Sequence, residues 1–251
     1  MKNLVGKRHI VIPDTQVKKG VRTDHLEAIG NYIAEKRPEV IVQLGDFADM
    51  PSLSTHNTKG HFEYEGQRYQ RDIDAAKAGM ERLVKPFGKL GGYKPRMVLT
   101  MGNHEDRITR LIAQEPKLIG KISLDDLGYE DYGWKVIPFR QPKKIDGITY
   151  CHYFVSGKYD RPIERAAALI SKNHQSCIAG HQQGRDIAYG KHADGRHITS
   201  IIAGSFYDHN EKYMSPQSNN HWRGAYYLTE VKAGSFDEVA LSLNYLKRQW
   251  L

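Results

Sequence analysis

Residues of the kinds that bind metal ions stand in five short segments of this chain, far apart in the sequence. The segments are Val11–Gln16, Leu44–Asp49, Gly102–Glu105, Tyr150–His152 and Ala179–Gln183. Four of them follow a short apolar, β-branched or aromatic run, which is typical of a buried strand that presents a ligand at its carboxyl end. The runs are His9–Ile12, Val40–Leu44, Met97–Thr100 and Ile148–Tyr150. The ordered set predicts a metal centre, and the chain must fold so that these strand ends meet.

The types of ligand narrow the chemistry of this centre. Asp carboxylates, an Asn amide and His imidazoles form a mixed oxygen and nitrogen set, which suits Mn, Fe, Zn or Mg better than a soft ion. Cysteine is therefore not expected to be a ligand. Taken singly, Asp14 and Asn103 are also consistent with turn residues, and His152 with an ordinary strand histidine. That explanation has to account for five separate segments in one order, so we favour the metal centre.

The series of motifs resembles that of a known enzyme family. It comprises Asp-x-Gln from Asp14, Gly-Asp-x-x-Asp from Gly45, Gly-Asn-His-Glu from Gly102, His152, and Gly-His-x-Gln from Gly180. This order is similar to that of the calcineurin-like metallophosphoesterases, from Asp14 to Gln183, and the two middle motifs match letter for letter. The resemblance implies a pair of divalent metal ions and cleavage of phosphate esters by activated hydroxide.

The resemblance also implies which residues bind the two ions. It makes Asp46 the carboxylate shared by both. One ion is further held by a complete set, namely Asn103, His152 and His181. The other is held by Asp14, Gln16 and Gln183.

Both departures from the family pattern fall on the second of these sets. Gln16 and Gln183 stand where the family usually has His. An amide oxygen is a weaker, harder donor than imidazole, so this site is expected to favour Mn²⁺ or Mg²⁺ and to bind it loosely. Mn is the expected metal, with Fe, Zn or Mg as alternatives. A one-metal variant and a phosphate-binding relative with weakened catalysis remain open.

Three further residues are candidates for catalysis. The resemblance implies that His104 contacts the phosphate or protonates the leaving oxygen, and that Asp49 orients it. Arg107 either donates to a phosphate oxygen or pairs with Asp106 or solvent at the start of a helix. The family's protein serine/threonine phosphatases have Arg where this chain has Met101, which argues against a dedicated phosphoprotein phosphatase. A zinc hydrolase of the His-Glu-x-x-His type is excluded, because no second His follows His104 at that spacing.

Strand and helix patterns alternate along the chain, as in an α/β layered fold. Helices are predicted from Asp24, with Glu27 as its capping-box partner, from Tyr69 to Leu83, and from Asp160 through Ala166–Ile170. After His181 only strands are predicted, at His197–Ala203, Ala225–Val231 and Glu238–Leu246. The length and apolar content predict a single domain over residues 1–251. The resemblance implies that it is built as a four-layer αββα sandwich of two mixed β-sheets flanked by helices. The metal site then lies in the loops at the carboxyl ends of the strands.

Two long segments without periodicity are predicted to form the rim of the active site. Residues 50–67 carry His56, Lys59, His61, Phe62 and Tyr64. Residues 204–224 carry Tyr207, His209, Lys212, Tyr213, His221, Trp222 and Arg223. Aromatic side chains interleaved with cations suit stacking on bases and contacts to phosphate. Alternatively, they cover an apolar patch.

Charge and cysteine content agree with an intracellular enzyme. The net charge is +8, which suggests a polyanionic partner such as nucleic acid, although a basic surface alone also explains it. Cys151 and Cys177 cannot build a disulfide framework, so a reducing, cytoplasmic compartment is expected. No apolar run long enough for a membrane span and no signal-peptide pattern is present. The oligomeric state is not predicted.

These observations predict a metal-dependent phosphoesterase. A phosphodiesterase or nuclease acting on nucleic acid or nucleotides is favoured, because of the basic charge and the aromatic segments. A phosphomonoesterase is the alternative.

Overall fold

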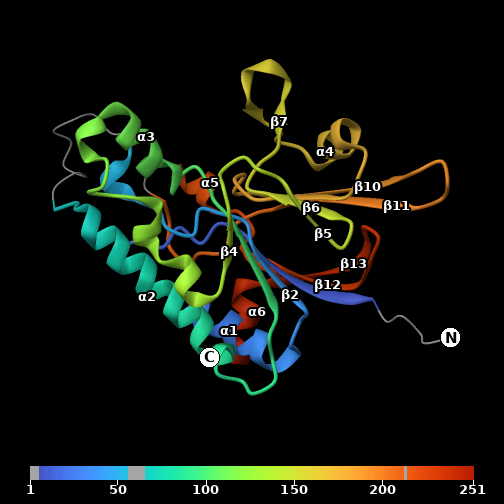
Figure 1. Ribbon diagram of the computed structural model, residues 1–251. Coiled ribbons are helices and arrows are strands. Elements are labelled where there is room, and N and C mark those ends of the chain that lie inside the picture. Colours follow the sequence, from blue (N-terminus) through green and yellow to red (C-terminus); the bar gives the residue numbers. More distant parts are fainter. Residues whose placement is uncertain (1–5, 56–65, 212–213) are drawn as a thin grey trace.

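The computed structural model of this chain describes residues 6–55, 66–211 and 214–251. Two mixed β-sheets lie face to face in it, and helices cover their outer faces (Figure 1). The order of the first sheet is β13-β12-β1-β2-β3-β4, and that of the second is β10-β11-β9-β6-β5. The predicted four-layer αββα architecture is confirmed.

The first sheet has a parallel centre with an antiparallel pair at one side. Its parallel strands are β1 (Lys7–Ile12), β2 (Val40–Gln43), β3 (Arg96–Thr100) and β4 (Lys135–Ile137). The antiparallel pair is β12 (Gly224–Lys232) and β13 (Ser235–Ser242), and β12 pairs with β1. Sequence positions more than 200 apart are thus joined in one sheet.

The second sheet repeats this plan on a smaller scale. Its parallel strands are β6 (Ile148–Cys151), β9 (Cys177–Ala179) and β11 (His197–Ala203). The antiparallel edge strands are β5 (Lys143–Ile145) and β10 (Arg185–Lys191). A separate small hairpin joins β7 (Val155–Ser156) and β8 (Arg161–Pro162).

Alternation along the strands explains the layers. In β1, Ile10 and Ile12 belong to the apolar cluster under the helices, whereas Val11 belongs to the cluster between the two sheets. In β2, Ile41 and Val42 are divided in the same way. Because successive side chains of a strand point to opposite faces, a strand that is apolar throughout is buried on both faces.

Helices complete the outer layers. The first sheet is covered by α1 (Asp24–Lys36), α2 (Tyr69–Gly88) and the C-terminal α6 (Leu243–Trp250), and the second by α4 (Ala166–Asn173). In α1 the predicted face is correct, since Leu26, Ile29 and Ile33 are all buried. Two further helices, α3 (Asp106–Gln114) and the short α5 (Pro216–Asn219), flank the loops at the carboxyl ends of the strands. No helix in the described ranges is long and apolar enough to cross a membrane.

The predicted strand Glu238–Leu246 and the absence of helices after His181 are wrong. The strand β13 ends at Ser242, and α6 follows at once. The Ser242 side chain accepts a hydrogen bond from the backbone N of Tyr245 at 3.2 Å, which caps the helix. Leu243 and Leu246 are then buried together, at helical rather than strand spacing.

Two predicted helix starts also differ from the structure. Asp160 has a left-handed φ of 53° at the end of a short 3-10 turn, Gly157–Tyr159, and α4 begins only at Ala166. At α1, no capping box forms, because Asp24 pairs with Arg22 and Glu27 with Arg82 instead of with backbone N–H groups. The strand β10 was not predicted from the sequence.

Candidate metal centre

The predicted ligands follow the carboxyl ends of strands from both sheets. Asp14, Asp46 and Asn103 lie beyond β1, β2 and β3, which are neighbours in the first sheet. His152 and His181 directly follow β6 and lie just beyond β9, which are neighbours in the second. Parallel strands place their carboxyl ends at one edge, and the two docked sheets bring these edges together.

Tight turns hold the ligands at this edge. Asp46 and His181 have left-handed φ values of 49° and 68°, and Gly45, just before Asp46, has a φ of 90°. A Cβ at Gly45 would lie 2.6 Å from the carbonyl of Thr100, and one at Gly102 would lie 2.1 Å from Asp46 Oδ1. The two glycines therefore let the loops after β2 and β3 approach each other closely.

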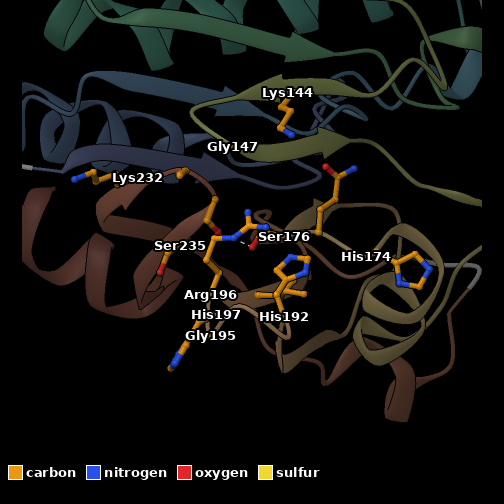
Figure 2. A pocket seen from close by; sticks show the side chains of 14 residues that line it. Lys144, Gly147, His174, Ser176, His192, Gly195, Arg196, His197, Lys232 and Ser235 are labelled. Atoms are coloured by element: carbon orange, nitrogen blue, oxygen red, sulfur yellow. Dashed lines mark hydrogen bonds between the residues drawn. The ribbon is translucent and has the colours of Figure 1, made fainter.

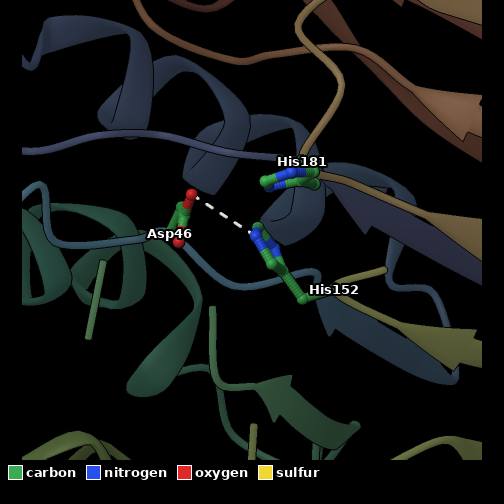
Figure 3. A group of neighbouring side chains, drawn as sticks. All are labelled: Asp46, His152 and His181. Carbon is green, nitrogen blue, oxygen red and sulfur yellow. Dashed lines mark ion pairs between the residues drawn. The ribbon is translucent and has the colours of Figure 1, made fainter. Parts of the chain in front are cut away.

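Four predicted ligands of one metal ion lie together. Asp46, His152 and His181 each offer a ligand atom within 4.8 Å of the others (Figure 3). Asn103 Oδ1 lies 2.9 Å from His152 Nε2 and 2.8 Å from His181 Nδ1. The imidazole Nδ1 of His152 lies 2.8 Å from the carbonyl oxygen of Leu44, which fixes the ring so that Nε2 faces the cluster. This arrangement is compatible with a bound divalent cation.

Charge in this cluster is set by burial and by the neighbouring groups. Burial opposes ionisation of Asp46, but the imidazoles of His104 and His152 outweigh it and hold the pKa of the carboxyl well below its usual range. Burial also disfavours protonated His152, but the Asp46 carboxylate raises its pKa to about 9. Burial lowers the pKa of His181 to about 4, so this imidazole is neutral at pH 7. Asp46 and His181 are thus in the forms that bind metal ions, whereas His152 has to release a proton when an ion binds.

The second predicted set surrounds Asp14. This fully buried carboxyl accepts a hydrogen bond from the backbone N of His181 at 2.9 Å and one from Gln183 Nε2 at 3.3 Å. Burial, together with the charge of Asp46, raises its pKa to about 7. Gln16 is tied to the same region, because its backbone N donates to the carbonyl of Asp46 at 2.9 Å.

Two amide oxygens in this set lack a donor. Gln16 Oε1 and Gln183 Oε1 are both buried and have no hydrogen-bond partner among the described residues. Buried acceptors are rarely left unpaired, and each such atom calls for an explanation. A hard cation beside Asp14 that reached these oxygens would satisfy them and neutralise the carboxyl group, so the donor types of these residues fit a divalent ion.

His104, Asp49 and Arg107 form one packed unit beside Asp46. His104 Nδ1 lies 2.8 Å from Asp49 Oδ1, and its Nε2 lies 3.7 Å from Asp46 Oδ2. Burial works against the protonated ring, but the carboxylates of Asp46 and Asp49 outweigh it and raise the pKa of His104. Arg107 is only 7% exposed and donates to the carbonyls of Asp49 and Met50 at 2.7 and 3.2 Å. Asp106 pairs with Arg110 instead of with Arg107.

Sequence reasoning missed three charged residues of this region. Glu105 is fully buried and accepts from the backbone N of Asp46, Gly102 and Ala48, each at 3.0 Å. Lys18 Nζ lies 2.7 Å from Asp49 Oδ2 and 2.7 Å from Glu211 Oε2. Glu105 stands within a motif, but the pairing of Lys18 with Glu211 spans 193 positions and leaves no pattern in the sequence.

One of the predicted rim segments begins at the centre. Phe206 N donates to the carbonyl of Asp14 at 2.7 Å. Tyr207 is fully buried, stacks on His209 with ring centroids 4.7 Å apart, and lies under the Arg223 guanidinium. Tyr207 is therefore not exposed for stacking on a base, and the alternative, a covering role, describes it better. Several predicted rim residues lie outside the described residues, namely His56, Lys59, His61, Phe62, Tyr64, Lys212 and Tyr213.

Comparison with known proteins gives partial matches. No family model matches the chain. The Gene 54 protein of Mycobacterium phage L5 is 31% identical over 139 residues, covering 53% of this chain and 52% of that protein. The Gene 54 protein of Mycobacterium phage D29 is 34% identical over 103 residues, covering 41% and 38%. The chain thus spans about half, or less, of the length of these relatives.

Among solved structures, YfcE, a phosphoesterase from E. coli, aligns with 94% of this chain and 100% of its own. The sequence identity is 12% and the TM-score 0.41. So low a structural overlap supports no conclusion about activity, and the names of the phage relatives state none.

Proposed function

We propose that this protein is a metal-dependent phosphoesterase of the calcineurin-like type. The observation that carries the proposal is the convergence of Asp46, Asn103, His152 and His181 from two sheets and four separate loops. A structural role alone gives no reason to bury a carboxylate, an amide and two imidazoles at one point.

The bound ions would be held by two sets of residues that share Asp46. The set with Asn103, His152 and His181 offers nitrogen and oxygen, and the set with Asp14, Gln16 and Gln183 offers oxygen alone. The all-oxygen set supports Mn²⁺ or Mg²⁺ at that position. Divalent cations held here would supply positive charge that activates water and stabilises the attacking and leaving oxygens.

The chain's own groups complete the reaction. His104 holds a proton beside the centre, since its pKa is raised, and it donates that proton to the departing oxygen of the ester. Asp49 fixes the ring through Nδ1, so that Nε2 is directed towards the cluster. Arg107 holds the loop of Asp49 and Met50 in place through their carbonyls, and so supports the residue that orients His104.

A phosphodiester in a nucleic acid or nucleotide is the substrate class that we favour. The net charge of +8 supports it, because a positive surface attracts polyanions. A phosphomonoesterase is the runner-up, and a phosphate-binding relative with weakened catalysis is the second alternative, to which the Gln16 and Gln183 substitutions point.

The decisive experiment compares Asp46→Asn with Asp194→Asn. Asp194 is exposed in a hairpin and pairs with Arg196, so it serves as the matched carboxylate control. Metal content is measured by elemental analysis, and hydrolysis is measured with an aryl phosphate monoester and diester in Mn²⁺. We expect Asp46→Asn to lose bound metal and at least about 100-fold of turnover, and the control to keep both. Turnover like that of the wild type in Asp46→Asn would remove the mechanism.

A second variant separates metal binding from proton donation. His104→Ala is expected to keep its metal while turnover falls about 100-fold or more, because a positioned acid contributes on that order. The ratio of diester to monoester rates in the wild type decides between the two substrate classes. Full metal content without any hydrolysis of either ester would support the non-catalytic alternative.

A further inference from the structure

A cavity of about 540 Å³ opens at the edge of the sheets opposite the candidate metal centre. Its wall includes Gly147 just before β6, Ser176 just before β9 and His197 at the start of β11. His152 and His181 follow β6 and β9 at their other ends. Ser176 and His181 are five positions apart along β9, which at the rise of a strand is roughly 16 Å. The cavity is therefore a site of its own.

The lining of the cavity is basic. Its side chains come from separate elements, with Lys144 from β5, Lys232 from β12 and His174 after α4 (Figure 2). The cationic and imidazole members are Lys144, Arg196, Lys232, His174, His192 and His197, and no carboxylate is among the residues that line it. In the described part of the chain, Lys144 and Lys232 make no ion pair, while the Nε of Arg196 lies 2.7 Å from Asp194.

The floor of the cavity is fixed by close packing of the two sheets. A Cβ at Gly147 would lie 2.2 Å from the backbone N of Gly234, so the β5–β6 turn rests directly on the β12–β13 turn. Ser176 Oγ donates to the carbonyl of Gly234 at 2.6 Å and accepts from Thr199 N at 3.2 Å. The residues that form the floor are thus held in place by contacts within the protein.

The composition of the wall identifies the chemistry of the ligand. Lys144 and Lys232 make no ion pair among the described residues, and cations and imidazoles that line one concavity suit phosphate oxygens. No Phe, Tyr or Trp side chain is among the lining residues, so bases find no large aromatic surface for stacking. The large apolar residue in the wall, Ile198, is only 5% exposed, which disfavours insertion into a membrane surface.

From these observations we propose that the cavity is a second anion site, which binds the phosphodiester backbone of a nucleic acid without reading its sequence. It anchors a polynucleotide on the face remote from the metal centre. The proposal goes beyond the proposed hydrolysis and does not require it.

The test removes three cations from the cavity and three from elsewhere. The cavity variant is Lys144→Gln, Arg196→Gln and Lys232→Gln together. The control is Lys89→Gln, Lys121→Gln and Arg248→Gln, which changes the net charge equally at exposed positions outside the cavity. Fluorescence anisotropy is measured with the full chain in Mn²⁺ and a labelled single-stranded DNA carrying phosphorothioate linkages, which keep their charge and resist cleavage.

We expect the cavity variant to bind this DNA about 10-fold more weakly, and the control within about 2-fold of the wild type. The slope of log affinity against log salt concentration is expected to fall by about 2 in the cavity variant, since each phosphate contact contributes about 0.7. Inorganic tripolyphosphate is expected to compete with the DNA for the wild type. Equal losses in both variants, or no loss in either, would overturn the proposal.

Two further measurements distinguish this proposal from membrane binding and from a role of the cavity in hydrolysis. Phosphatidylserine vesicles replace DNA in a second series, and binding that depends on the cavity for vesicles but not for DNA would overturn the assignment to nucleic acid. The cavity variant is expected to hydrolyse a small aryl phosphate as fast as the wild type. Because binding of the phosphorothioate DNA is measured without any hydrolysis, failure of the proposed enzyme activity leaves the result on the cavity intact.

Discussion

Lys18 is the residue on which the buried charges beside the centre depend. Its ammonium group lies between Asp49 and Glu211, which are 6% and 4% exposed, and Asp49 in turn holds His104. Buried carboxylates cost free energy unless a partner neutralises them. A residue without direct contact to the predicted ligands therefore supports the ring that we assign as proton donor.

Lys18→Met tests this support. Removal of one partner from a buried charged group is expected to cost about 2–4 kcal/mol of unfolding free energy, with the lower part of the range favoured because Lys18 is 20% exposed. Urea unfolding measures the loss, and elemental analysis is expected to show unchanged metal. Lys19→Met, an exposed neighbour, is the control. A variant as stable as the wild type would show that Lys18 is dispensable.

Gln16 and Gln183 permit a gain-of-affinity prediction. Gln16→His with Gln183→His replaces two weak oxygen donors with imidazole, so the Asp14 set is expected to bind a divalent ion at least about 10-fold more tightly. Chelator competition with Zn²⁺ and Mn²⁺ measures the change. Gln182→His, one position away, is the control. Unchanged affinity would mean that positions 16 and 183 do not face the ion.

Single residues show what the sequence can locate and what it cannot. Asp46, Asn103, His152 and His181 stand in recognisable motifs, and the structure brings them together. Arg107 has no such guide, since the chain alone does not reveal that its guanidinium is occupied by the carbonyls of Asp49 and Met50. The partnership of Lys18 and Glu211 was likewise out of reach, because it depends on how distant loops pack.

At the scale of elements, the turn between β3 and α3 sets the space for the centre. Gly102→Ala places a methyl group where Asp46 Oδ1 already lies, at 2.1 Å. We expect it to destabilise the fold by about 1–3 kcal/mol and to lower metal content, because the Asp46 loop must move. Gly91→Ala, where a Cβ meets nothing within 4 Å, is the control for chemical denaturation and elemental analysis. Equal stability and metal content in both variants would refute the constraint.

Helix α1 carries a buried histidine that has no hydrogen-bond partner. Neither ring nitrogen of His25 is paired among the described residues, and the ring packs edge-on against Phe206. His25→Phe is expected to stabilise the protein by about 1 kcal/mol at pH 7, since it removes two unsatisfied polar atoms. Urea unfolding beside the exposed control His174→Phe measures this. A loss of stability in His25→Phe would mean that the imidazole is satisfied.

The same substitution changes the dependence of stability on pH. Burial lowers the pKa of His25 from 6.5 to about 4 in the folded protein. Between these values the unfolded chain binds the proton and the folded chain does not, so stability falls as pH drops from 6.5 to 4. His25→Phe is expected to make that fall shallower. Burial also lowers the pKa of His9 to about 4, so His9 still contributes to the fall in stability in this variant.

Strands and helices were predicted correctly where the sequence carries the periodicity of only one of them. The apolar runs before Asp14, Asp46, Asn103 and His152 are strands in the structure. A short, continuous apolar run is typical of a strand whose sheet is covered on both faces. Leu241 to Leu246 shows the limit, since the apolar spacing of a strand passes directly into that of a helix at Ser242. Only the capping hydrogen bond of Ser242 and the joint burial of Leu243 and Leu246 show where the strand ends and the helix begins.

At the scale of the whole molecule, metal binding is expected to stabilise the docked pair of sheets. Mn²⁺ at about 100 times its dissociation constant should add about 2.7 kcal/mol, and chelation by EDTA should remove it. Thermal unfolding with and without each reagent measures the shift. Asp194→Asn should respond like the wild type and Asp46→Asn should not respond. An equal response in Asp46→Asn would place the ion elsewhere.

The layered architecture was predicted from the resemblance to a known enzyme family. The order of the strands within each sheet was not predicted. Nothing local in Gly224–Lys232 shows that this strand pairs with β1, because pairing over more than 200 positions is decided by the whole fold. The basic cavity is a product of that order, since it forms where the β12–β13 turn meets the β5–β6 turn.

The late arrival of β12 and β13 has a consequence during protein synthesis. All candidate ligands have been synthesised by residue 183, before the sheet that carries Asp14, Asp46 and Asn103 has received its two C-terminal strands and α6. The strands that carry the candidate ligands are therefore made before the strands and the helix that complete their sheet. We expect a chain truncated before β12 to contain every candidate ligand and still bind no divalent ion in a fixed position, because the loops that hold the ligands depend on the completed sheet.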